Sequence, residues 1–305
     1  MTDIICKTTN LTKRYHNFTA LDGVNLTLHR GEILGLVGEN GAGKTTFMRL
    51  LTGLSFPTSG SFSLFGETRH LARQRARIGC IIETPALYSD MTAAQNLEVQ
   101  RLQRGIPGKG CIDEALSLVG LKDVGNKRAG QFSLGMRGRL ALAIALLGEP
   151  EWLILDEPIN GLDPTAIIEL RTLLRELAQQ KQVTILISSH ILSELEQLAT
   201  SYAFLHKGRL LEQTSAKALA ARCRRHILLH TDDAARSAAL LEERLGIHDY
   251  TAGPDGNLRI YEQLDARPQI ARLMTEAGLA IDTLAVQGES LEGYFEHLIG
   301  GGDHV

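Results

Sequence analysis

Gly38-Glu39-Asn40-Gly41-Ala42-Gly43-Lys44-Thr45-Thr46 stands between the apolar run Ile33 to Val37 and a segment with a helical pattern. Glycines at this spacing between a strand and a helix are typical of a phosphate-binding loop. Small residues allow backbone N–H groups to turn toward the α and β phosphates, and the helix directs the positive end of its dipole at the same anion. The stretch therefore predicts binding of a nucleoside triphosphate.

The side chains of the loop have separate expected roles. Lys44 reaches the β and γ oxygens, and the Thr45 hydroxyl is placed to ligate Mg²⁺. The other residues expected to contact the nucleotide are Gly38, Glu39, Asn40, Gly41, Ala42, Gly43 and Thr46. An accidental glycine-rich turn is the alternative, but both flanks fit a strand and a helix. The loop alone does not separate a kinase, a GTPase, a helicase or a transport ATPase.

Composition limits the class of protein. The chain has 305 residues, of which 44% are hydrophobic and 22% charged, enough for one large or two modest domains. A net charge of -3 gives no overall basic field, so we expect no nucleic-acid partner. No apolar run reaches the roughly 18 residues that span a bilayer, and the start lacks a signal-like segment, so we expect a cytoplasmic protein.

The four cysteines are scattered, which suits a reduced compartment, and we interpret them as packing residues. Cys223, His226 and His230 have a spacing that a metal ion accepts, but they lie where an apolar strand begins. A metal site there is the lesser alternative.

The order of hydrophobic patterns predicts an α/β fold with a parallel sheet. We expect an early strand through Val24 to Leu28 and then the strand that enters the phosphate loop. Further predicted strands and helices are strands at 61–65, 78–82, 152–155, 183–188, 202–205 and 209–211, and helices within 92–119 with a break at 105–110, at 134–147 and from 163 onward. Thr92 is a candidate helix cap.

The pattern changes near residue 216, which predicts a nucleotide-binding domain over 1–216 and a small α+β accessory domain over 217–305. The expected elements of the second domain are a strand at 227–230, a helix at 234–245, a hairpin around Pro254-Asp255-Gly256, a helix at 267–277, a strand at 281–286 and a final helix. Leu291, Tyr294, Phe295 and Leu298 share one face of that helix. We interpret this stripe as core, with a dimer or membrane-partner surface as the alternative.

Two carboxylates follow the apolar run Trp152 to Leu155 and should emerge at the edge of the sheet beside the phosphate loop. Asp156 can complete the Mg²⁺ site begun by Thr45, and Glu157 can orient or deprotonate the water that attacks the γ phosphate. A solvated acidic turn is the alternative. His190 follows another sheet strand, so we expect it at the same edge as a γ-phosphate sensor, although a lone histidine is usually structural.

Together these motifs over residues 4 to about 216 resemble the ATP-binding cassette (ABC) family. The diagnostic element is Phe132-Ser133-Leu134-Gly135-Met136, which is similar to the family's LSGGQ signature. The resemblance implies a P-loop fold with an antiparallel β subdomain and a helical subdomain. It also implies a homodimer, because Ser133 and Gly135 would contact the γ phosphate of ATP held by the other copy.

Three further positions of this chain resemble functional positions of the family. Tyr15 lies where the family places an aromatic ring on adenine, and ordinary surface packing is the alternative. Asn160-Gly161-Leu162-Asp163 resembles the loop that crosses the dimer interface, and Asp163 also fits as the cap of the helix that begins at Pro164. Glu83 stands where most cassettes have a glutamine that touches Mg²⁺ or water and the membrane subunit. The change keeps oxygen acceptors and adds charge, so Glu83 could still sense the cation, or could be a tolerated surface acid.

Glu83, the divergent signature and the trailing domain resemble the branch that contains the ATPases of bacitracin and lantibiotic immunity exporters. That resemblance implies an ATPase with ATP and Mg²⁺ as cofactors, bound to an integral-membrane permease at the inner face of the membrane. Two other functions remain open: a soluble cassette ATPase that remodels ribosomes or DNA, and a regulatory module that binds ATP without hydrolysing it.

Overall fold

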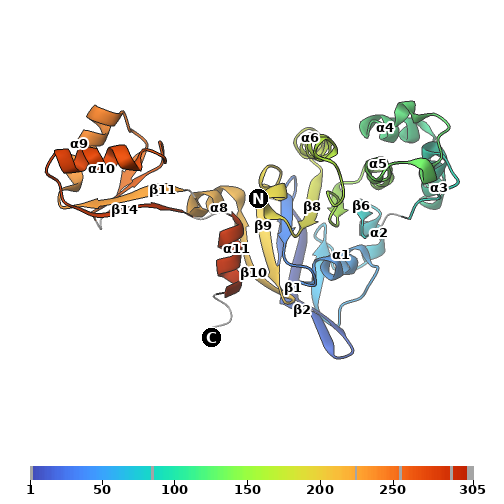
Figure 1. Ribbon diagram of the computed structural model, residues 1–305. Helices are drawn as coiled ribbons and strands as arrows, with labels where there is room; N and C mark the ends of the chain where they lie inside the picture. Colours follow the sequence, from blue (N-terminus) through green and yellow to red (C-terminus); the bar gives the residue numbers. More distant parts are fainter. Residues whose placement is uncertain (1–2, 84–85, 224, 254–255, 289–290, 301–305) are drawn as a thin grey trace. The chain divides into compact units, whose positions relative to one another are not determined.

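The computed structural model describes residues 3–83, 86–223, 225–253, 256–288 and 291–300. The chain divides into two compact units, Met1–Ala216 and Lys217–Val305. Each unit has its own hydrophobic core. Figure 1 shows the helices and strands of both units.

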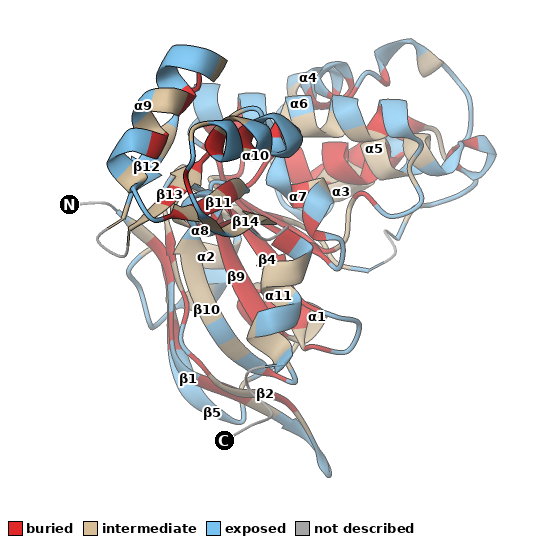
Figure 2. Ribbon diagram, turned by 60° about the vertical axis from the view of Figure 1, so that its left-hand side comes forward, coloured by how far each residue is buried: buried red, intermediate tan, exposed pale blue. Residues whose placement is uncertain are grey.

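The first unit is built on a six-stranded sheet, and the predicted parallel sheet is confirmed. In spatial order its strands are β10 (Arg209–Ser215), β9 (Ser201–His206), β4 (Ile33–Val37), β8 (Thr184–Ser189), β7 (Trp152–Leu155) and β6 (Ile78–Ile81). All neighbours are parallel except β10, which is antiparallel to β9. Every residue of β4 and β7 is buried, as is typical of parallel strands in the interior of a sheet. In Figure 2, β4 and most of β9 have the colour of buried residues.

A second, antiparallel sheet of the first unit contains β1 (Ile4–Tyr15), β2 (Phe18–Val24), β3 (Thr27–His29) and β5 (Ser59–Leu64), with β1 paired to the other three. The predicted single strand through Val24 to Leu28 is wrong, because Val24 ends β2 and β3 begins at Thr27. Between them the Asn25 side chain donates to the Gly23 carbonyl and accepts from the Asn10 N–H. These side-chain bonds take the place of a continuous ladder.

The helices of the first unit follow the predicted order. They are α1 (Lys44–Thr52), α2 (Leu71–Arg75), α3 (Ala93–Gln103), α4 (Gly110–Leu118), α5 (Leu134–Leu146), α6 (Pro164–Gln180) and α7 (Leu192–Glu196). Helix α8 (Ala216–Cys223) begins at the last residue of the first unit, and its other residues belong to the second. Thr92 caps α3 in a reciprocal capping box with Gln95, which confirms the predicted cap. Helices α3, α4 and α5 pack together, and α5 lies against β6 (Figure 1).

The second unit is a β-α-β-β-α-β arrangement, the ferredoxin-like pattern. Its elements are β11 (His226–Thr231), α9 (Ala234–Leu245), β12 (Tyr250–Ala252), β13 (Asn257–Ile260), α10 (Arg267–Glu276), β14 (Ile281–Gln287) and α11 (Leu291–Gly300). The strand order is β12-β13-β11-β14, all antiparallel. Buried residues of β11 and β13 form one core with Leu241 of α9 and with Ile270 and Met274 of α10, so both helices cover the same sheet face.

The sequence also predicts a turn at 254–256, a buried face on α11 and, as the lesser alternative, a metal site at Cys223, His226 and His230. Pro254 and Asp255 of the expected turn lie outside the described residues. On α11, Leu291 is buried while Tyr294, Phe295 and Leu298 are half-buried. Within the described ranges, no cluster of three His, Cys, Asp or Glu residues has metal-binding geometry. A helix of sufficient length and hydrophobicity to cross a membrane is likewise not found among the described residues.

Candidate functional site

The phosphate loop joins the end of β4 to the start of α1, as the sequence predicts. Gly43 precedes α1 with φ 108°, a left-handed conformation that favours glycine. A Cβ on Gly43 would lie 2.5 Å from the Ala20 carbonyl oxygen, and one on Gly38 would lie 2.4 Å from the Leu205 carbonyl oxygen. Both positions therefore require glycine, and the loop lies close against its neighbours at the positive end of α1.

Lys44 is held over the loop and is only 5% exposed. Its Nζ donates to the carbonyl oxygens of Gly38 at 2.6 Å and Glu39 at 3.2 Å, and lies 3.3 Å from Oε1 of Glu157. The hydrogen bonds of the Lys44 ammonium group are thus made to protein oxygens, and phosphate oxygens of a bound nucleotide would take the place of these acceptors. Phe18, Ala20 and Thr46 also line the hollow around this loop.

Asp156 and Thr45 meet where β7 ends beside α1. The Thr45 hydroxyl donates to Oδ2 of Asp156 at 2.7 Å, and the Ser188 hydroxyl donates to Oδ1 of the same carboxylate at 2.6 Å. Asp156 is 7% exposed, so these bonds fix its orientation in a largely dry environment. Ser188 lies near the end of β8, the neighbour of β7 in the sheet.

Glu157 is the centre of a group of polar contacts. Its Oε2 lies 3.1 Å from Nδ1 of His190 and accepts a hydrogen bond from Nδ2 of Asn160, while Oε1 faces Lys44. Burial alone would raise the pKa of this carboxyl, but the Lys44 charge, the Asn160 hydrogen bond and the His190 ring lower it below its ordinary value. Glu157 is therefore ionised near neutral pH, as a general base must be.

The backbone at Glu157 is unusual for a residue with a side chain. Its φ is +47°, in the left-handed region, and its N–H donates to Oγ of Ser188 at 2.9 Å. Conformations of this kind persist where surrounding bonds hold them, and they concentrate at functional sites. The turn directs the carboxylate back toward Lys44.

The donor set around Thr45 fits Mg²⁺. A hydroxyl and a carboxylate are hard oxygen ligands, and Mg²⁺ is commonly held by one or two such groups together with phosphate oxygens and water. The oxygens of Thr45 and Asp156 lie within hydrogen-bonding distance of each other, so these two residues would hold the cation at the end of β7 beside α1. Bound Mg²⁺ would neutralise charge on the β and γ phosphates.

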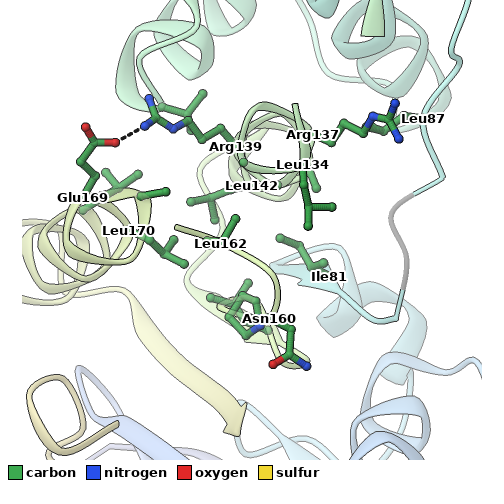
Figure 3. A pocket seen from close by; sticks show the side chains of 18 of the residues that line it. Ile81, Leu87, Leu134, Arg137, Arg139, Leu142, Asn160, Leu162, Glu169 and Leu170 are labelled. Atoms are coloured by element: carbon green, nitrogen blue, oxygen red, sulfur yellow. Dashed lines mark hydrogen bonds and ion pairs between the residues drawn. The ribbon is translucent and has the colours of Figure 1, made fainter. Parts of the chain in front are cut away.

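The signature residues begin α5. Ser133 is the N-cap, and its Oγ accepts a hydrogen bond from the Met136 N–H at 3.2 Å. Gly135 lines a cavity of about 1030 Å³ that also reaches Thr45 and Glu157. In Figure 3, Leu134 and Leu142 of α5 and Leu162 line this cavity, and Arg139 forms an ion pair with Glu169 of α6.

Of the other three predicted site residues, Glu83 lines the cavity that reaches Thr45 and Glu157, whereas Tyr15 and Asp163 are not among the residues that line it. The Tyr15 ring, 39% exposed, carries the Lys13 ammonium 4.7 Å from its centroid, while Phe18 lines the hollow at the phosphate loop. Glu83 lines the large cavity and forms an ion pair with Arg49. The predicted cap at Asp163 is confirmed, because its Oδ1 accepts from the Ala166 N–H at 3.0 Å.

Three contacts of the site are absent from the sequence predictions. Ser188 holds Asp156, Asn160 holds Glu157, and Arg49 holds Glu83. Ser188 was detectable in principle, because the carboxyl ends of neighbouring parallel strands meet at one edge. Asn160 contacts Glu157 within one turn of the chain, three residues away, whereas Arg49 and Glu83 are 34 residues apart and meet only through the folding of the chain.

Comparisons with known proteins show the family of this chain. A family model described as ABC transporter matches residues 21–160. The bacitracin transport ATP-binding protein BcrA of Bacillus licheniformis is 44% identical over 300 residues, which are 98% of this chain and 98% of BcrA. The lantibiotic transport ATP-binding protein SrtF of Streptococcus pyogenes is 43% identical over 205 residues, 67% of this chain and 88% of SrtF. A solved ATP-binding subunit of an ABC transporter aligns with TM-score 0.64 and 30% identity, covering 71% of this chain and 92% of its own.

The likeness to BcrA covers both units, and the phosphate loop, the Asp156-Glu157 pair and the Ser133 cap lie together in the first. The chain therefore belongs to the ABC transporter family, as an ATP-binding subunit that hydrolyses ATP.

Proposed function

We propose that two copies of this chain close head to tail on two molecules of MgATP and that their hydrolysis drives export of a peptide antibiotic through a separate membrane permease. The observation that carries this proposal is the position of the Glu157 carboxylate. It lies between Lys44 and His190, next to the loop that would hold the phosphates.

In the proposed mechanism each residue has one task. Backbone N–H groups of 38–43 and the start of α1 bind the α and β phosphates, and Lys44 leaves its carbonyl partners to contact the β and γ oxygens. Thr45 and Asp156 hold Mg²⁺. Glu157 orients the water and accepts its proton, and His190 contacts the γ phosphate while supporting Glu157. The Tyr15 ring stacks on adenine.

The second copy completes each site. Ser133 and the N–H groups that begin α5, Gly135 among them, would donate toward the γ phosphate bound by the partner. The segment from Asn160 to Asp163 would lie at the contact between the two copies and connect their sites. One chain carries one phosphate loop and one signature segment, which supports a symmetric pair.

The export of a peptide is supported by the likeness to BcrA over 98% of both chains and by the likeness to SrtF. We place the protein at the inner face of the membrane through its permease, with Glu83 coupling hydrolysis to that partner. The alternative is a soluble cassette ATPase that remodels ribosomes or DNA. It has no comparable support from the relatives named above.

Two substitutions test the ATPase mechanism. Glu157→Gln keeps the shape of the side chain but removes the base, so ATP should still bind, hydrolysis should fall by a factor of about 100 or more, and ATP-bound dimers should accumulate in size-exclusion chromatography. Lys44→Ala should lose tight ATP binding and form no such dimers. Glu176→Gln, an exposed acid on α6, is the matched control. Parental hydrolysis by Glu157→Gln would show that another group is the base.

A separate experiment tests the transport assignment. The tagged protein should co-sediment with a multi-span membrane protein from lysed cells, and its loss should increase sensitivity to bacitracin. Recovery with ribosomes in place of membranes would favour the soluble alternative. Unchanged ATPase activity and unchanged resistance in both Glu83→Gln and Glu83→Ala would remove the coupling role of Glu83.

A further inference from the structure

Arg49 forms an ion pair with Glu83, which lines the cavity that reaches Thr45 and Asp156. Nη2 of Arg49 lies 2.6 Å from Oε1 of Glu83. Arg49 belongs to α1, and Glu83 follows β6, so the pair joins the helix of the phosphate loop to the end of an edge strand.

The position of Arg49 on α1 relates this pair to the expected cation. Arg49 follows Thr45 by four residues, and residues at that spacing lie on the same face of a helix, one turn apart. The Thr45 hydroxyl is bonded to Asp156. The carboxylate that Arg49 holds is therefore kept on the side of α1 that carries the cation ligands, and Glu83 lines the same cavity as Thr45 and Asp156.

The contact leaves part of the carboxylate for other partners. The ion pair uses Oε1 of Glu83, and in the described part of the chain no contact of Oε2 is found. Arg49 can thus fix the direction of the carboxylate while one oxygen remains for a cation or its water. A bidentate arginine contact would have occupied both oxygens.

Glu83 needs a partner for two physical reasons. Its φ is +58°, an unfavourable conformation for a residue with a side chain, and fixing the side chain helps to define this backbone. It also adds a carboxylate to a cavity that is already lined by Asp156, Glu157 and Glu169, and like charges oppose one another. The Arg49 guanidinium offsets that charge.

The pair is too exposed to be a major source of stability. Arg49 is 38% and Glu83 57% exposed, and ion pairs in water contribute little to the free energy of unfolding. Its effect should appear in the geometry of the site.

We propose that Arg49 is a positioning residue that holds the Glu83 carboxylate at the cation site and offsets its charge. This inference rests on the proposed Mg²⁺ site at Thr45 and Asp156. The ion pair accounts for a glutamate at this position, because the positive charge of Arg49 on α1 balances the negative charge of Glu83.

A double-mutant cycle in the full-length protein tests the inference, with Mn²⁺ as the probe and its binding in the presence of a slowly hydrolysed ATP analogue measured by electron paramagnetic resonance. Arg49→Met should weaken Mn²⁺ binding by about tenfold, as removal of a group that orients a metal ligand does. Arg49→Lys, which keeps the positive charge, should weaken Mn²⁺ binding less than Arg49→Met does. In the Glu83→Ala background, Arg49→Met should cause no further loss.

Two controls separate positioning from a general defect. Arg73→Met removes an exposed arginine of α2 and should leave Mn²⁺ binding unchanged, and the urea midpoint of Arg49→Met should equal that of the parent. Equal Mn²⁺ losses from Arg49→Met with and without Glu83 would overturn the inference, as would parental Mn²⁺ binding by Arg49→Met. If the parent itself binds no Mn²⁺ with the analogue, the proposed cation site fails first.

Discussion

At the scale of single residues, the ionisation of Glu157 depends on its immediate neighbours. Burial opposes ionisation of this carboxyl, and the Lys44 charge and the Asn160 amide favour it, with the net effect of a lowered pKa. Because the two nearest charged groups have other tasks at the phosphates, Asn160 is the neighbour that can be changed with the least loss of nucleotide binding.

We expect Asn160→Ala to change the pH dependence of ATP hydrolysis. Loss of the amide donor raises the pKa of Glu157, so the acid limb of kcat should move to higher pH, and kcat at pH 7.5 should fall by about tenfold as the base loses its orientation. Steady-state ATPase assays between pH 5 and 8.5 would measure both effects.

Asn160→Asp provides the comparison for that profile. A second carboxylate beside Glu157 should raise its pKa further, so its acid limb should lie above that of Asn160→Ala. Identical pH profiles for parent, Asn160→Ala and Asn160→Asp would show that Asn160 does not influence the base.

At the scale of secondary-structure elements, α5 is positioned by its contact with β6. A Cβ on Gly79 would lie 2.1 Å from the Ala145 carbonyl oxygen and 2.9 Å from Cδ2 of Leu153. The helix therefore approaches the strand across a residue without a side chain. Because α5 begins at Ser133 as its cap, this close packing also determines where the signature residues lie.

Gly79→Ala should destabilise the protein, because the added methyl group displaces α5 from β6. Overpacking of this kind costs about 1–3 kcal/mol of unfolding free energy, which urea denaturation would measure. Gly138→Ala is the matched control: it lies inside α5, its Cβ meets only Leu162 at 3.8 Å, and alanine is the better helix former. If Gly79→Ala were as stable as Gly138→Ala, the close approach of α5 to β6 would not be important.

At the scale of the whole molecule, the two units have separate hydrophobic clusters. One surrounds the fully buried Trp152 in the first unit, and the other surrounds Ile227 and Leu229 in the second. Trp152 is the single tryptophan of the sequence, so its fluorescence reports on the first unit alone. Circular dichroism reports on the helices and strands of both.

Leu229→Ala should destabilise the second unit without changing the first. Truncation of a fully buried leucine costs about 2–5 kcal/mol, so the circular-dichroism transition in urea should begin at lower denaturant while the Trp152 fluorescence transition stays in place. Leu186→Ala, which truncates a fully buried leucine of β8, should move the Trp152 fluorescence transition to lower urea concentration. A common shift of both signals in Leu229→Ala would indicate that the two units unfold together.

Local patterns of the sequence determined most elements of this fold. The glycines of 38–43, the cap residues Thr92 and Asp163 and the apolar run before Asp156 each act within one turn or strand, where backbone sterics and side-chain period decide the structure. The predicted helix at 234–245 has the bounds of α9. Strand β1 was not predicted from the sequence. Its register against β2, β3 and β5 shifts at bulges, and these bulges interrupt the alternation of apolar residues.

The partners of the site residues were decided by the tertiary structure. Ser188 can donate a hydrogen bond to Asp156 because β8 is paired with β7. Arg49 can donate to Glu83 because β6 ends next to α1. Sequence spacing gives no information about these pairs, since strand order in a sheet is set by how the whole chain buries its apolar faces. The sequence by itself therefore determined which chemical groups this protein has, and the packing of distant strands and helices determined which of them meet.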